Sequence, residues 1–231
     1  MRIIKKTIEK GYGRRFAFGD IHGCYHTFSS IITELKITRE DQIFLLGDMI
    51  NRGAYSKETL DYIIDNREKG CQIFPVRGNH EEVIINHLEK FSETFYFHAM
   101  KSDLVFMFDK KGKVHEKYVD FFTQLPYFIE LDVALLVHAG FNFKKKPFED
   151  TYDMITIREF KVDNEILNGK RIIHGHTPIH INTILDSVLN KSPVINIDNG
   201  CVLTRKTKGK GNLVCLNIDT LEIIYRPNID N

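Results

Sequence analysis

Short apolar segments alternate with helical patterns in the N-terminal part of the chain. Residues 15–18, 42–46 and 72–76 are runs of mostly aromatic and aliphatic side chains, a pattern typical of buried strands. Phe28, Ile31, Ile32 and Leu35 follow the first run at the spacing of one helix face. Similar helical patterns follow the other two runs. This alternation predicts an α/β fold whose first three strands end at one edge of a sheet.

The second helix is expected to begin with Ser56 as its capping residue and to end near Gly70. The pattern breaks between residues 91 and 124, where aromatic residues are interleaved with charges. We interpret this stretch as a helical and aromatic insert over the sheet edge; the alternative is that its rings simply belong to the core. Further strands are expected at 127–130, 133–138, 171–173, 194–197, 213–218 and 222–225. No repeat or linker divides the sequence, so we expect a single domain over residues 1–231.

The composition is that of an ordinary soluble protein, with 231 residues, 42% hydrophobic and 27% charged, and a net charge of +1. The near-neutral charge argues neither for a nucleic acid nor for a membrane surface, and we expect neither as a partner. No stretch approaches the ~20 apolar residues of a membrane helix, and the charged start does not resemble a signal peptide. The four cysteines have no paired spacing, which indicates free thiols and a cytoplasmic location.

Six potential metal ligands lie at the ends of five predicted strands, each beside or close to a glycine. They are Asp20, His22, Asp48, Asn79, His138 and His176. Carboxylate, imidazole and amide ligands together suit two divalent ions such as Mn²⁺, Fe or Zn²⁺. Two metals about 3.5–4 Å apart need a bridging carboxylate, for which Asp48 is the candidate. Taken alone, Asp20 and His22 fit a helix cap and a loop residue equally well, but ligands at five strand ends favour a metal centre.

Five motifs surround these residues in order along the chain. They are Gly-Asp-Ile-His-Gly (19–23), Gly-Asp-Met-Ile-Asn-Arg-Gly (47–53), Arg-Gly-Asn-His-Glu (77–81), His-Ala-Gly (138–140) and Gly-His-Thr-Pro (175–178). Together they resemble the phosphoprotein phosphatase family of calcineurin-like metallophosphoesterases, and most closely its short bacterial and phage members. The segment 197–200, Ile-Asp-Asn-Gly, also resembles the C-terminal part of that family.

The resemblance implies a sandwich of two mixed β-sheets flanked by helices, with two divalent metal ions at one edge. Mn²⁺ is the first choice, with Fe or Zn²⁺ as alternatives. Carried over position by position, Asp20, His22 and Asp48 would hold the first metal. Asp48, Asn79, His138 and His176 would hold the second.

The resemblance also implies catalytic roles. His80 would be the general acid that protonates the leaving group, and Asp48 would bridge the metals that activate the attacking hydroxide. Arg52 and Arg77 would bind phosphate oxygens through bidentate hydrogen bonds. Arg158 would be a third phosphate-binding arginine.

Three functions are compatible with this resemblance. The first choice is a Ser/Thr protein phosphatase that acts on phosphorylated proteins. The alternative is a symmetrical bis(5'-nucleosyl)-tetraphosphatase, which hydrolyses diadenosine tetraphosphate. A non-catalytic binding module is the third, disfavoured because all six ligands and His80 are present.

One position departs from the family pattern. Asn51 stands where the family has an aspartate that pairs with the histidine corresponding to His80. An aspartate would stabilise the charged imidazole, whereas the asparagine can only orient the ring. We therefore expect His80 to be a weaker acid catalyst than its counterparts in the family.

Overall fold

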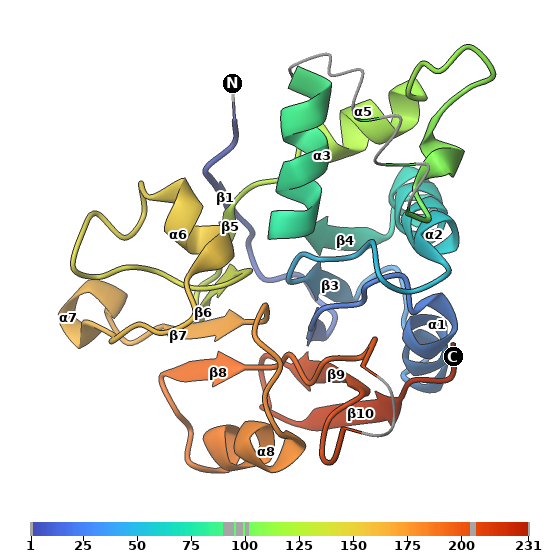
Figure 1. The fold of residues 1–231 in the computed structure, drawn as a ribbon. Coiled ribbons are helices and arrows are strands. Elements are labelled where there is room, and N and C mark those ends of the chain that lie inside the picture. Colours follow the sequence, from blue (N-terminus) through green and yellow to red (C-terminus); the bar gives the residue numbers. More distant parts are fainter. Residues whose placement is uncertain (1, 90–94, 96–98, 100–101, 204–206, 231) are drawn as a thin grey trace.

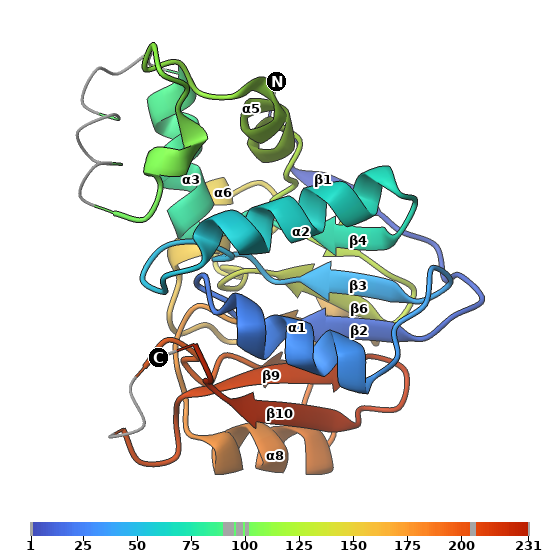
Figure 2. The same ribbon diagram turned by 90° about the vertical axis from the view of Figure 1, so that its right-hand side faces the viewer.

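The computed structural model describes residues 2–89, 95, 99, 102–203 and 207–230. Two five-stranded sheets pack face to face, with helices on both outer sides (Figures 1 and 2). One sheet has the order β1-β5-β6-β7-β8, and the other has the order β10-β9-β2-β3-β4. Both sheets contain parallel and antiparallel pairs. The expected sandwich of two mixed sheets is therefore confirmed.

The strands are β1 (Lys5–Thr7), β2 (Arg15–Phe18), β3 (Gln42–Leu45), β4 (Gln72–Pro75), β5 (Phe128–Glu130), β6 (Ala134–Val137), β7 (Arg171–His174), β8 (Val194–Asn196), β9 (Asn212–Asn217) and β10 (Ile223–Pro227). The helices are α1 (Tyr25–Glu34), α2 (Ser56–Glu68), α3 (Asn79–Glu89), α5 (Glu116–Thr123), α6 (Thr151–Thr156), α7 (Asn164–Leu167) and α8 (Ile181–Leu189), with a 3₁₀ turn η1 (Val105–Met107).

Alternation along β2 explains why the sheet has two covered faces. Phe16 and Phe18 pack against the helices on the outer side, where Phe28 of α1 and Leu60 of α2 belong to the same buried cluster. Ala17 points the other way, into the cluster between the two sheets. Because successive side chains of a strand point to opposite faces, a short run of apolar residues contributes to both layers.

The first three predicted strands are parallel neighbours. β2 pairs with β3 and β3 pairs with β4 in parallel register. Their carboxyl ends therefore meet at one edge of the sheet, as the strand–helix alternation predicted. Four elements were not predicted from the sequence: β1, α6, α7 and α8.

The start of α2 differs from expectation. The helix begins at Ser56 itself, and the preceding Tyr55 makes no capping bond through its side chain. The Ser56 hydroxyl accepts a hydrogen bond from the Asn51 backbone N–H at 2.9 Å. The Ser56 N–H is capped instead by the carboxylate of Asp103, at 3.1 Å. A residue distant in sequence has taken the capping role that was assigned to Ser56.

Part of the predicted insert 91–124 lies outside the described residues. Within the described part, Phe95 is 3% exposed, and its ring stacks on His87 with centroids 5.0 Å apart. Met107 of η1 and Phe122 of α5 are buried in the same cluster as the α1 and α2 side chains. Phe95, Met107 and Phe122 therefore belong to the core, whereas Tyr96 and Phe97 lie outside the described residues.

The N-terminus of α1 is capped from the other end of the sequence. The Asp230 carboxylate accepts hydrogen bonds from the backbone N–H groups of His26 and Thr27, at 2.7 and 2.9 Å. Figure 1 shows the C-terminal segment lying beside α1. The helix that follows the Gly-Asp-Ile-His-Gly motif (19–23) is thus fixed by a distant residue.

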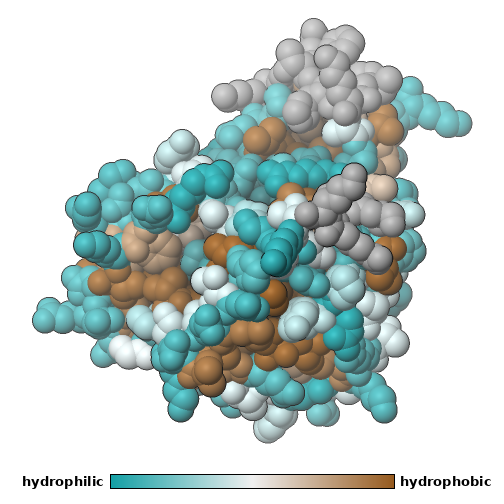
Figure 3. Space-filling model, turned by 60° about the horizontal axis from the view of Figure 1, so that its bottom comes forward, coloured by the Kyte–Doolittle hydropathy of each residue, from teal (hydrophilic) through white to brown (hydrophobic). Residues whose placement is uncertain are grey.

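The face that carries α8 mixes hydrophobic and hydrophilic side chains (Figure 3). Ile184 of α8 is buried, whereas Leu185 and Leu189 are exposed. Among the described residues, no helix is both long and apolar enough to cross a membrane.

Candidate metal centre

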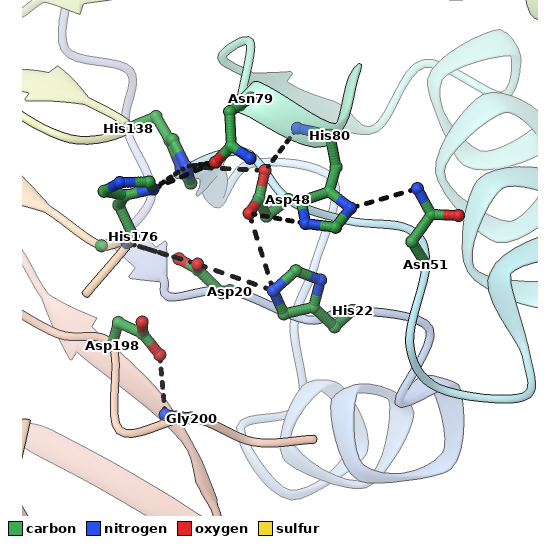
Figure 4. A network of polar contacts seen from close by, with 12 residues as sticks. Asp20, His22, Asp48, Asn51, Asn79, His80, His138, His176, Asp198 and Gly200 are labelled. Carbon is green, nitrogen blue, oxygen red and sulfur yellow. Dashed lines mark hydrogen bonds and ion pairs between the residues drawn. The ribbon is translucent and has the colours of Figure 1, made fainter. Parts of the chain in front are cut away.

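The six predicted ligands converge at the strand edge, with Asp48 in the middle (Figure 4). They follow the carboxyl ends of β2, β3, β4, β6 and β7. Asp48 belongs to two groups of side chains able to hold a metal, one with His22 and His80, the other with His138 and His176. Its carboxylate is therefore in the position expected of a ligand shared by two metals.

Three ligand atoms on one side of Asp48 point at one another. Asn79 Oδ1 lies 3.0 Å from both His138 Nε2 and His176 Nδ1, and these two nitrogens are 3.1 Å apart. The other ring nitrogen of His138 lies 2.7 Å from the Leu46 carbonyl and must donate its proton there. His138 Nε2 therefore presents a lone pair to the amide oxygen. Two lone pairs at this distance repel each other, and a cation between them would remove the repulsion.

The other side of Asp48 shows the same feature. His22 Nδ1 lies 3.0 Å from the Ile50 carbonyl, so its proton is used there and Nε2 carries a lone pair. That Nε2 lies 3.6 Å from Asp48 Oδ2 and 3.9 Å from Asp20 Oδ2, too far for a hydrogen bond to either. This donor set fits a divalent cation, and the whole arrangement fits two.

Ionisation in the site depends mainly on burial. Burial raises the pKa of Asp48 to about 7, and burial with the nearby Asp198 raises that of Asp20 well above its usual range. Burial also lowers the pKa of His22 to about 3 and of His138 and His176 to about 4. The imidazoles are thus neutral at pH 7 and able to coordinate, while the carboxylates would lose protons when a cation binds.

The backbone of the site is strained. Three ligands, His22, Asp48 and His176, have left-handed φ angles of 48°, 48° and 72°. Residues other than glycine adopt such angles at a cost of order 1–3 kcal/mol each, and they cluster at functional sites. A Cβ on Gly175 would lie 2.1 Å from Asp20 Oδ1, so this glycine is required for the close approach of two ligand-bearing turns.

His80 lies between Asp48 and Asn51 (Figure 4). Its Nε2 is 3.9 Å from Asp48 Oδ2, and its Nδ1 is 3.1 Å from Asn51 Nδ2. Burial, followed by the charge of Arg52, lowers the pKa of His80 to about 4. Donation from the Asn51 amide to Nδ1 leaves the ring proton on Nε2, the atom that faces the metal ligands.

The three predicted phosphate-binding arginines differ in position. Arg52 is exposed at the edge of the site with a left-handed φ of 78°. Arg158 is exposed too, and its charge adds to the lowering of the His176 pKa, after burial and His138.

Arg77 does not reach the site, so its predicted role as a phosphate clamp is wrong. Its side chain is 1% exposed and donates to Glu82 Oε2 at 2.9 Å and to the Leu125 carbonyl at 3.1 Å. Its guanidinium lies 4.5 Å from the centroid of the Tyr127 ring. A motif position cannot reveal this, because the partners come from distant segments.

Two buried carboxylates lie near the ligands: Glu81, which was considered from the sequence as an alternative partner of His80, and Asp198, to which no role was assigned. Glu81 is fully buried and accepts hydrogen bonds from the backbone N–H groups of Asp48, Met49 and Gly78, at 2.8 to 2.9 Å. It therefore fixes the Asp48 turn and does not pair with His80. Asp198 accepts from the Gly200 N–H at 2.7 Å, and burial raises its pKa to about 7. Glu81 lies in the motif at 77–81 and Asp198 in the segment at 197–200. Their position within these motifs was the sequence feature that could have identified them.

Comparison with known proteins agrees with this geometry. A family model described as calcineurin-like phosphoesterase matches residues 14–204. A symmetrical bis(5'-nucleosyl)-tetraphosphatase from Methylobacillus flagellatus is 32% identical over 127 residues, which make up 54% of this chain and 42% of that protein. The asymmetrical bis(5'-nucleosyl)-tetraphosphatase PrpE of Bacillus subtilis is 26% identical over 221 residues, covering 82% of this chain and 87% of that one. The chain thus spans less than half the length of the first relative, but most of the second.

Solved structures show the same fold. A crystal structure of a candidate diadenosine tetraphosphatase superposes with a TM-score of 0.71 at 18% identity, covering 99% of this chain and 100% of that chain. A serine/threonine phosphatase from Saccharomyces cerevisiae superposes with a TM-score of 0.56 at 14% identity, covering 97% of this chain and 82% of that chain.

Proposed function

This chain belongs to the calcineurin-like phosphoesterase family, and from that premise we propose that it hydrolyses dinucleoside polyphosphates such as diadenosine tetraphosphate. Members of this family use divalent metals, and Mn²⁺ is our first choice for this chain. The named relatives support the substrate, since both the symmetrical and the asymmetrical enzymes cleave dinucleoside tetraphosphates according to their names. The protein phosphatase, our first choice from sequence, becomes the second candidate.

Asp20, His22 and Asp48 would hold one ion, and Asp48, Asn79, His138 and His176 the other. When bound, such ions supply Lewis acidity at the phosphate and an acidified water. Arg52 and Arg158 would orient the phosphate and offset its charge. His80 Nε2 would donate a hydrogen bond to the leaving oxygen, while Asn51 holds the imidazole in the required tautomer.

The observation that carries the proposal is the pair of Asn51 and His80. The partner of His80 Nδ1 is an amide at 3.1 Å, at the point where a carboxylate would stabilise a charged imidazole, and burial with the charge of Arg52 lowers the pKa of His80 to about 4. A neutral imidazole is a weak acid. A nucleotide leaves from a phosphoanhydride as a weakly basic phosphate, which needs little protonation, whereas a serine alkoxide needs a proton. The site therefore suits an anhydride better than a phosphoserine ester.

The test compares three substrates with one Mn²⁺-loaded preparation: diadenosine tetraphosphate, a phosphoserine peptide and p-nitrophenyl phosphate. We expect kcat/KM for the dinucleotide to exceed that for the phosphopeptide by about 100-fold or more, the lower end of what general acid catalysis contributes. Chromatography of the products separates symmetrical cleavage to two ADP from asymmetrical cleavage to AMP and ATP.

Asp48→Asn is the control for contaminating activity, because it weakens both metal sites and should abolish hydrolysis of all three substrates. A phosphopeptide turned over as efficiently as the dinucleotide would contradict the proposal and favour the protein phosphatase.

A further inference from the structure

A cavity of about 450 Å³ opens beside His80, and Asn51 and Arg52 also line it. Its volume is within the range of about 300–1,000 Å³ typical of small-molecule sites. His80 and Asn79 form one wall, while Ser102 and Asp103 come from the segment after α3. A leaving group bound at His80 would extend along the ring into this cavity, because His80 and Asn79 both line it.

Asp103 is held in place by a chain of hydrogen bonds that ends at His80. Its Oδ2 accepts from the Ser56 N–H at 3.1 Å, and the Ser56 hydroxyl accepts from the Asn51 N–H at 2.9 Å. Asn51 in turn lies 3.1 Å from the His80 ring. Asp103 is half-buried, and only one of its two carboxylate oxygens is used in this chain of bonds. Because Asp103 lines the cavity, its other oxygen is available as an acceptor there.

The side chains that line the cavity differ in charge and polarity from one end to the other. Arg52 supplies a positive charge near the phosphate site, and Asp103 supplies a negative one. Val83 is a 42% exposed apolar side chain three residues after His80, on the same face of α3. A nucleotide has this order of groups: an anionic phosphate, an apolar ring surface, and hydroxyl or amine hydrogen-bond donors. A second anionic group beside Asp103 would be repelled.

We propose that this cavity binds the nucleoside of the leaving nucleotide and that Asp103 selects it by accepting hydrogen bonds from its uncharged donors. Those donors are the ribose hydroxyls or the amine of the base. The inference rests on the proposed function and goes further by assigning a specificity-determining residue.

Asp103→Asn is the variant that tests it. The asparagine keeps the size of the side chain and an oxygen that can accept from Ser56 N–H, but it loses the charge. We expect kcat/KM for diadenosine tetraphosphate to fall about 10-fold or more, the effect of one charge-assisted hydrogen bond. Activity on p-nitrophenyl phosphate, whose leaving group has no donor, should stay within about twofold, and it also reports correct folding. Asp120→Asn is the matched control, because Asp120 is an exposed carboxylate on α5 outside this cavity.

Two analogues distinguish the donors. Diinosine tetraphosphate lacks the base amine, and a 2',3'-dideoxy analogue lacks the ribose hydroxyls. The penalty of Asp103→Asn should disappear for whichever analogue lacks the recognised donor. A penalty that persists with both analogues, equal losses on p-nitrophenyl phosphate, or full activity of Asp103→Asn on the dinucleotide would overturn the assignment. Wild-type protein that cleaves the phosphopeptide but no dinucleotide would instead overturn the proposed function, and this inference with it.

Discussion

Asn51 is a single residue that sets how well His80 can act as an acid. Replacing it with aspartate places a carboxylate where the amide now lies, 3.1 Å from His80 Nδ1. A negative charge there raises the His80 pKa from about 4, so more of the ring is protonated at neutral pH.

The expected result of Asn51→Asp is therefore a gain on substrates with poor leaving groups. We expect kcat on a phosphoserine peptide to rise about 10-fold, a part of the 10²–10⁴ typical of general acid catalysis. The alkaline limb of the pH profile on the phosphopeptide should move to higher pH, because a raised pKa keeps His80 protonated up to a higher pH. p-Nitrophenyl phosphate needs little protonation and should change little. Identical pH profiles of both proteins on the phosphopeptide would show that residue 51 does not tune His80.

Arg77 is a residue whose loss should affect stability and leave phosphate binding unchanged. Its guanidinium is buried against Glu82, Tyr127 and the Leu125 carbonyl. We expect Arg77→Ala to lower the free energy of unfolding by about 3–5 kcal/mol, as when a buried ion pair loses one partner. Urea unfolding measures this loss, and inhibition by inorganic phosphate should be unchanged. Arg52→Ala should behave in the opposite way, with weaker phosphate inhibition at unchanged stability.

At the scale of elements, the end of β3 and the start of α3 are joined through Glu81. Its carboxylate accepts three backbone N–H groups, two from the turn after β3 and one from Gly78. A Cβ on Gly78 would lie 2.3 Å from Asp48 Oδ1, so the two segments are in close contact.

Glu81→Gln should loosen this junction. The glutamine keeps one acceptor oxygen, but its NH₂ group replaces the other. That NH₂ group then faces backbone N–H groups, so donor meets donor and no hydrogen bond forms. We expect a loss of about 1–3 kcal/mol in urea unfolding of the metal-free protein, the cost of unsatisfied buried groups. Calorimetry should show weaker Mn²⁺ binding, because Asp48 is less well positioned. Glu116→Gln, at the exposed start of α5, is the control, and equal stability of the two variants would contradict the role of Glu81.

The elements that could be predicted from the sequence are those with a local cause. β2, β3 and β4 carry their own apolar patterns, and the ligand positions follow because parallel strands end at a common edge. The arrangement of Ser56 and Arg77 depends on residues far away in sequence, so no local pattern reveals it. Asp103 caps α2 at Ser56, which is 47 residues away in sequence, and Arg77 donates to the Tyr127 hydroxyl, which is 50 residues away. The local sequence made Ser56 a reasonable capping residue and Arg77 a reasonable phosphate ligand. In the structure, tertiary contacts give both residues other roles.

At the scale of the whole molecule, the metal centre links stability to pH. Burial raises the pKa of Asp48 and Asp198 to about 7, above the value of about 3.9 in an unfolded chain. Between these values the folded state binds more protons than the unfolded state, so this contribution to stability is full at low pH and is lost as pH rises through about 7. The buried histidines have lowered pKa values, so they reduce the stability of the folded state as pH falls below about 6.5. They do not contribute above that pH.

Metal-free protein should therefore lose thermal stability between about pH 6.5 and 8. Divalent ions neutralise the deprotonated carboxylates, so the rise in Tm on adding Mn²⁺ should be larger at pH 8 than at pH 6.5. Differential scanning calorimetry with and without chelator measures both effects. A metal-induced rise in Tm that is the same at the two pH values would contradict the linkage.

The cap that Asp230 places on α1 has a consequence for how the protein folds during synthesis. The carboxylate meets the His26 N–H across 204 residues of sequence, and β9 pairs with β2 across a similar separation. A nascent chain that has emerged only through the last ligand, His176, has an open edge on β2 and an uncapped helix after the His22 turn. Contacts of such long separation form late and slowly. The His22 turn and the β2 edge therefore reach their final contacts only after residues 212–230 have left the ribosome.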